Sequence, residues 1–292
     1  MSETMDVLLN RSSVRNFTDE RIDPVLLDQI LNIAIHSASG GNLQPISIIK
    51  IESRETKQWL TDLGLQKFIA KAPVDLLFCL DFHRLKRWAK LEGAPFVMDE
   101  SIRHFFIGFE DTIIAAQTVE TAVNACGLGC VYIGGVIDMI DLLKERLDLP
   151  QGVIPLVMLA IGHPGENKKA APKLALETIV HEETYHDPDD ACLMKAFKNK
   201  FGEPSLEINN DRLERILKVV EETDGLDRVN EVREYFEIHD TIPKSMQYFC
   251  MIYMANLMAS DNTRTMDILE KDGFLWAGRK NHPECVEFKE YE

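Results

Sequence analysis

The chain has 292 residues, of which 45% are hydrophobic and 27% charged, as is ordinary for a globular protein. Its 48 acidic and 32 basic residues give a net charge of -16, which argues against nucleic acid or an anionic membrane as a general partner. Because no apolar run approaches about 20 residues, we expect no membrane-spanning helix.

The N-terminal residues lack the basic and apolar regions of a signal peptide, and the six cysteines are scattered along the chain. These two features favour a cytoplasmic protein without a disulfide framework. We therefore expect cytoplasmic localisation.

In chain order, the first part alternates helical and strand patterns. Apolar spacing predicts helices at residues 24–34, 54–63, 101–125 and 140–147, and β-branched or continuous apolar runs predict strands at 46–51, 74–80, 130–133 and 154–161. From this alternation we expect a sheet covered by helices on both faces. The helix at 101–125 is so apolar that it is either a core helix or an interface helix.

After residue 187 the pattern is helical throughout, with three helices indicated around residues 213–220, 246–258 and 264–271. We therefore divide the chain into a core at residues 1–187 and a helical extension at residues 188–292. We expect the extension to pack on the core or on a partner subunit, with a separate small domain as the alternative.

Residues 11–15 read Arg-Ser-Ser-Val-Arg ahead of the first predicted helix of the core. Two guanidinium groups and two hydroxyl groups so close together are suited to a phosphate group, since arginine pairs two donors with its oxygens. A solvated turn with incidental surface charge is the alternative, and these residues alone leave it open.

Two loops are suited to a flat ligand. The loop from Ser39 to Pro45 is built of small and amide residues, which fit a heteroaromatic ring as well as an ordinary loop. Gly134 and Gly135 end a predicted strand, where glycine allows a ligand close to the backbone or makes a plain tight turn. The glycines from Gly127 onward follow a helix and lead into a strand, which excludes the dinucleotide-binding fingerprint.

Two other motifs are excluded on spacing. His181 and His186 are five residues apart, whereas the zinc-protease helix needs histidines four apart. Cys126 and Cys130 have no second pair, so buried thiols are the better interpretation.

Taken together, five segments resemble the nitroreductase superfamily of FMN-dependent oxidoreductases, and most closely its NADPH-dependent major nitroreductase and flavin reductase group. They occur in family order at residues 11–22 (RSSVRNFTDERI), 39–51 (SGGNLQPISIIKI), 65–82 (LQKFIAKAPVDLLFCLDF), 127–136 (GLGCVYIGGV) and 171–187 (APKLALETIVHEETYHD). Residues 189–244 then look like an insertion peculiar to this branch.

The resemblance implies an α+β, three-layer fold, in which helices flank a central, mainly antiparallel sheet and a helical C-terminal extension follows. It also implies an obligate homodimer with one FMN in each of two interface pockets. Hydride passes from NADPH or NADH through flavin N5 to an electron-poor acceptor (a nitroaromatic, a quinone or free flavin), with ping-pong kinetics and no catalytic side chain.

For the FMN phosphate, the resemblance implies Arg11, Ser12, Ser13 and Lys173. Lys173 stands where close relatives carry arginine, and Ala171 replaces a lysine. Around the ring it implies Arg15 near N1 and the C2 carbonyl and Gln66 at the pyrimidine edge.

The same resemblance assigns Tyr132, Ile133, Gly134 and Gly135 to the cofactor site, the glycines offering N–H groups near N5. Cys130 replaces a glycine that is usual in close relatives.

A partner chain is implied to supply Ser39, Asn42 and Gln44. Other flavin chemistry on this fold, such as reductive dehalogenation or flavin fragmentation, and a non-catalytic FMN-binding sensor or carrier are the alternatives.

Overall fold

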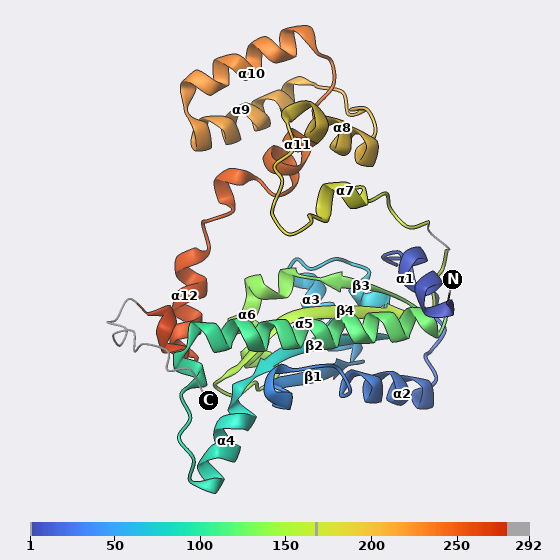
Figure 1. Ribbon diagram of the computed structural model, residues 1–292, viewed down its shortest axis with the longest axis vertical. Helices are drawn as coiled ribbons and strands as arrows, with labels where there is room; N and C mark the ends of the chain where they lie inside the picture. The colour runs from blue at the N-terminus through green and yellow to red at the C-terminus, as the bar shows by residue number, and fades with distance from the viewer. Residues whose placement is uncertain (1, 167–168, 279–292) are drawn as a thin grey trace. The chain divides into compact units, whose positions relative to one another are not determined.

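The computed structural model describes residues 2–166 and 169–278 (Figure 1). Its strands are β1 (Ile46–Ile51), β2 (Val74–Asp81), β3 (Gly129–Ile133) and β4 (Val153–Gly162). The helices of the first part are α1 (Glu3–Asn10), α2 (Pro24–Ala34), α3 (Arg54–Asp62), α4 (Phe82–Glu92), α5 (Ile102–Ala125) and α6 (Ile140–Arg146). Those that follow are α7 (Leu176–Ile179), α8 (Asp190–Phe201), α9 (Asn210–Asp224), α10 (Leu226–Ile238), α11 (Lys244–Met246) and α12 (Asn262–Lys271).

The four strands form one antiparallel sheet in the order β1-β2-β4-β3. Every residue of the two central strands is buried, which explains why both read as continuous apolar runs in the sequence. The strands β1 and β3 form the two edges. All four predicted strands are confirmed within one or two residues of their predicted limits.

Helices cover both faces of this sheet. On one face Leu77 and Met158 pack against α3 and α6, and on the other Phe78 and Leu159 pack against α2 and α5. Figure 1 shows α5 running the length of the sheet. The predicted α+β fold with helices on both faces of an antiparallel sheet is therefore confirmed.

The long helix α5 is a core helix. Its residues Ala115, Ala116, Val119 and Val123 are completely or almost completely buried between the sheet and α2. Its opposite side still exposes apolar residues such as Phe106, at 56% of its surface.

The described chain separates into two compact units, one formed by residues up to Ala170 together with those from Arg264 onward, and one formed by Ala171–Thr263. These limits differ from the predicted division at residue 187. The helix α12 packs with the first unit because Lys144 Nζ lies 2.5 Å from Asp272 Oδ1 and Arg264 Nη2 lies 2.8 Å from Asp141 Oδ1.

The second unit is helical and has its own core, in which α9 and α10 contribute residues such as Ile216, Val219 and Val232. The helix predicted around residues 246–258 is not continuous. A π-helical turn at Gln247–Ile252 follows α11, and Met254 then adopts a left-handed conformation with φ 52°.

A buried pair of titratable side chains, Lys57 and Asp75, lies inside the first unit. Lys57 Nζ is 3.7 Å from Asp75 Oδ2 and donates to the carbonyl oxygens of Ala72 and Pro73 at 2.5 and 2.8 Å. No described residue donates a hydrogen bond to either carboxylate oxygen of Asp75. Burial, only partly offset by Lys57, raises the pKa of Asp75 to about 8.

Replacing Asp75 by asparagine tests this pair. The folded protein holds a proton on Asp75 that the unfolded chain releases near pH 4, so the contribution of Asp75 to stability is lost as the pH rises through about 8. The unfolding free energy of Asp75→Asn minus that of the wild type should therefore increase as the pH rises from 5 to 8, by up to about 1.4 kcal/mol per pH unit. Denaturant unfolding measures the difference. The exposed Asp28→Asn controls for net charge, and a pH-independent difference at Asp75 would contradict the assignment.

Candidate functional site

The segment that carries the two arginines lies beside the edge strand β3. The Val14 N–H donates to the Cys130 carbonyl at 3.0 Å, and Ser13 forms a parallel bridge with Cys130. Val14 is buried against Gly129, where a Cβ atom would lie 2.5 Å from Val14 Cγ2. The missing side chain of Gly129 thus lets residues 11–15 approach the sheet.

Arg11 is held on two sides. Its Nη2 donates to Ser13 Oγ at 3.3 Å, and its Nε lies 2.9 Å from Glu120 Oε1, as an ion pair without an aligned hydrogen bond. Glu120 belongs to α5 and its side chain is 3% exposed. The guanidinium group is therefore held at its Nε edge by Glu120. Its two Nη1 N–H groups and one of its two Nη2 N–H groups donate to no described residue.

Arg15 has a different environment. It is exposed and makes no hydrogen bond or ion pair with any described residue of the chain. Ser12 and Ser13 are half-buried between the two arginines. The predicted phosphate-binding residues of this segment are thus brought together at one place, with one arginine anchored and one free.

The end of β3 continues the same edge. Tyr132 and Ile133 are its last residues, and Gly134 and Gly135 follow at the start of a 3-10 helix, where N–H groups have no partner within the helix. No atom would lie within 4 Å of a Cβ on Gly134, and a Cβ on Gly135 would lie 3.2 Å from Leu65 Cδ2. Gln66, the next residue after Leu65, is exposed.

Cys130, a residue of β3, is buried. Burial is the main cause that raises the pKa of its thiol to about 12. It is therefore a neutral packing residue rather than a nucleophile.

The loop with Ser39, Asn42 and Gln44 precedes the other edge strand, β1. The Gly40 N–H donates to both oxygens of the buried Asp111 on α5, at 3.0 and 3.1 Å. Ser39 Oγ accepts from the Gln44 N–H at 3.2 Å. Asn42 and Gln44 have positive φ angles of 55° and 50°, a conformation that costs energy in residues other than glycine and is common at functional sites.

The two groups of predicted residues therefore lie at opposite edges of the sheet. Both are attached to α5, one through Asp111 and the other through Glu120. These two acids are nine positions apart in the helix, which is roughly 14 Å along the helix axis.

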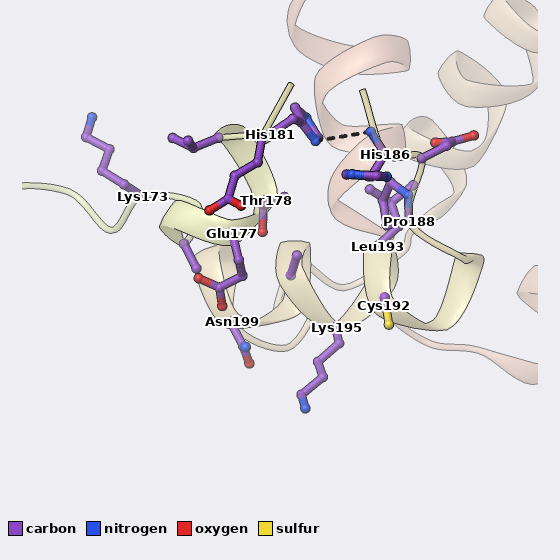
Figure 2. A pocket seen from close by; sticks show the side chains of 15 residues that line it. Lys173, Glu177, Thr178, His181, His186, Pro188, Cys192, Leu193, Lys195 and Asn199 are labelled. Atoms are coloured by element: carbon purple, nitrogen blue, oxygen red, sulfur yellow. Dashed lines mark hydrogen bonds between the residues drawn. The ribbon is translucent and has the colours of Figure 1, made fainter. Parts of the chain in front are cut away.

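Lys173 lies in the second unit. It lines a pocket there together with His181, His186 and Cys192 (Figure 2). The His186 N–H donates to His181 Nδ1 at 3.3 Å, and the histidines stand outside any helix, in agreement with the exclusion of a zinc-protease motif. Among the described residues no group of three His, Cys, Asp or Glu side chains could hold a metal ion.

Comparison with known proteins identifies the family. The model of the nitroreductase family matches residues 8–163. The chain is 35% identical over 196 residues to the oxygen-insensitive NADPH nitroreductase of Salmonella typhimurium, covering 67% of this chain and 80% of that protein. It is also 35% identical over 192 residues to an FMN reductase [NAD(P)H] of Bacillus subtilis, with 65% and 77% covered. The chain belongs to the nitroreductase family.

Solved structures extend the similarity beyond the matching sequence. NfrA2 of B. megaterium aligns with this nitroreductase-family chain at a TM-score of 0.70 and 27% identity, over 94% of this chain and 98% of that one. The hypothetical oxidoreductase YcnD of Bacillus subtilis gives 0.71 and 28%, with the same coverage. Such coverage includes most of residues 189–244, so both of these structures contain a counterpart of most of this stretch.

Two acids that hold the loops, Asp111 and Glu120, could not be singled out from motifs. Both are buried residues of α5. The available signal was an acidic residue within a largely apolar helix, isolated at Glu120 and beside Glu110 at Asp111, since an acid is buried only with a partner.

None of the described helices combines the length and apolar character needed to cross a bilayer. The five cysteines within the described residues are free thiols. Cys130 is buried as predicted, but Cys126 is exposed, so the interpretation of both as buried thiols is wrong for Cys126, which follows the last residue of α5.

Replacing Gly129 by alanine tests how the arginine segment is attached in this nitroreductase-family protein. The added Cβ collides with Val14, so we expect a loss of about 1–3 kcal/mol in unfolding free energy. Gly134→Ala is the matched control, because its Cβ meets open space and its φ of -82° suits alanine. Equal destabilisation by both substitutions, measured in denaturant, would contradict this account.

Proposed function

We propose that this protein is an FMN-dependent oxidoreductase that transfers reducing equivalents from NADPH or NADH to an electron-poor acceptor, such as a nitroaromatic, a quinone or free flavin. Family membership supports the reaction class, and relatives named NADPH nitroreductase and FMN reductase support the cofactor. The observation that carries the proposal is the pair of arginines beside β3, one anchored and one without a partner among the described residues.

The residues at this edge fit an FMN molecule. For its phosphate, Arg11 offers free Nη donors, and Ser12 and Ser13 add hydroxyl groups. The open space at Gly134 allows a flat ring to approach the backbone. We assign Lys173 to the phosphate as well, on the resemblance alone.

Bound flavin supplies a ring that accepts hydride at N5 and passes it on. This chain holds and tunes that ring. In our proposal Arg15 would hold the N1 side of the ring, and its permanent positive charge would favour the anionic, reduced flavin and so raise the reduction potential. The N–H groups of Gly134 and Gly135 would hold the N5 side of the ring without supplying a competing acid, and Gln66, Tyr132 and Ile133 would line the rest of the cofactor site.

A second copy of the chain completes the pocket. Ser39, Asn42 and Gln44 lie at the opposite edge of the sheet from Arg11, so in our proposal they serve the partner's FMN. Apolar side chains left exposed on α5, such as Phe106, support a homodimer. We place this dimer in the cytoplasm.

The proposal is tested on the purified protein. We expect a yellow solution with flavin absorption bands, and steady NADPH oxidation when a nitrofuran or a quinone is added. Because both substrates use one face of the flavin in turn, initial-rate lines should be parallel. Intersecting lines would exclude the ping-pong order, tight FMN without turnover would indicate a sensor or carrier, and a colourless protein that rejects FMN would overturn the proposal.

The role of Arg15 has its own test. Arg15→Met removes the charge but keeps a long side chain, and since Arg15 has no partner among the described residues, fold stability should not change. The midpoint potential of bound flavin should fall by about 30 mV or more, which equals about 1.4 kcal/mol for two electrons. Arg21→Met, also exposed, is the control. An unchanged potential in spectroelectrochemical titration would rule out this role.

A further inference from the structure

A buried acid sits directly behind the anchored arginine. Glu120 is surrounded by core residues of α5, and only 3% of its side chain is exposed. A carboxylate in such a place is costly unless a counter-charge and hydrogen-bond donors offset its desolvation. Arg11 Nε at 2.9 Å from Oε1 supplies the charge, and Gln117 Nε2 donates to Oε2 at 2.6 Å.

The amide that supports Glu120 is itself fixed. Gln117 Oε1 accepts from the Tyr132 hydroxyl at 3.3 Å, so the amide nitrogen has to face Glu120. Asn124 Nδ2 donates to the Glu120 carbonyl at 2.7 Å. Residues 117, 120 and 124 share one face of α5, and the chain of contacts runs from the end of β3 to Arg11.

This arrangement determines which donors of Arg11 remain for a ligand. A guanidinium group carries five N–H donors in a rigid plane. Glu120 lies against the Nε edge, and Ser13 Oγ accepts from Nη2. These two contacts fix the plane of the guanidinium group, and no described residue accepts from its remaining Nη donors, which stay available to a ligand.

We propose that Glu120 is a positioning residue that orients Arg11 for the phosphate group of the flavin, with Gln117 and Tyr132 as its support. The inference rests on the proposed function. In this proposal Glu120 does not touch the ligand and acts through Arg11. Replacing Glu120 therefore leaves the positive charge of Arg11 in place and removes the contact that orients it.

The test compares two ligands that differ only in the phosphate. We expect Glu120→Gln to raise the Kd of the apoprotein for FMN about tenfold or more, because Arg11 loses the carboxylate with which it forms a buried charge pair. The Kd for riboflavin should stay within about twofold. A merely structural role would weaken both ligands together.

Three further variants keep the test decisive. Glu110→Gln makes the same change at an exposed position of α5 and should leave both Kd values unchanged. Gln117→Ala removes the hydrogen bond that Gln117 donates to Glu120. Because Gln117 is exposed, this variant should fold even if Glu120→Gln does not, and it should selectively weaken the binding of FMN. In an Arg11→Gln background, Glu120→Gln should have little further effect on FMN.

The outcomes separate this inference from the proposed function. If the wild type binds FMN more tightly than riboflavin but Glu120→Gln and Gln117→Ala alter neither Kd, or alter both equally, the positioning role is overturned and the function stands. If the wild type binds neither ligand, the proposed function itself fails. A selective loss of FMN affinity that disappears in the Arg11→Gln background supports the inference.

Discussion

The attachment of loops to the helix α5 is the constraint on which the proposed site depends. This helix packs on the sheet through small and β-branched residues, and it carries two buried acids toward opposite edges. Asp111 holds the backbone before β1, and Glu120 holds Arg11 beside β3. Because buried carboxylates require partners, each acid fixes one loop whose own sequence has few apolar anchors.

The distance between these two attachments bears on how one pocket could be assembled from both loops. Roughly 14 Å of helix separates Asp111 from Glu120, and the loops lie at opposite edges of the sheet. In our proposal one chain therefore supplies the phosphate end and N5 side of a pocket, while its partner supplies the loop with Asn42 and Gln44. Their positive φ angles fit a loop held for a ligand rather than for its own stability.

Much of the fold could be predicted from local pattern. The strands β2 and β4 are buried on both faces and so appear as continuous apolar runs, and α5 shows the three- and four-residue spacing of a helix. The prediction of a continuous helix after residue 246 was wrong. The spacing of apolar residues does not reveal that Met254 adopts a left-handed conformation, which interrupts the helix.

The sequence by itself determined the family, the antiparallel α+β core and the short motifs that we assign to FMN, since each depends on neighbouring residues. Only the tertiary structure decided that Glu120 lies behind Arg11, that Gly129 leaves space for Val14 and that the predicted residues divide between two edges. The reason is that a local pattern fixes backbone conformation and buried faces, whereas charge pairs and close contacts depend on which distant segments the fold brings together.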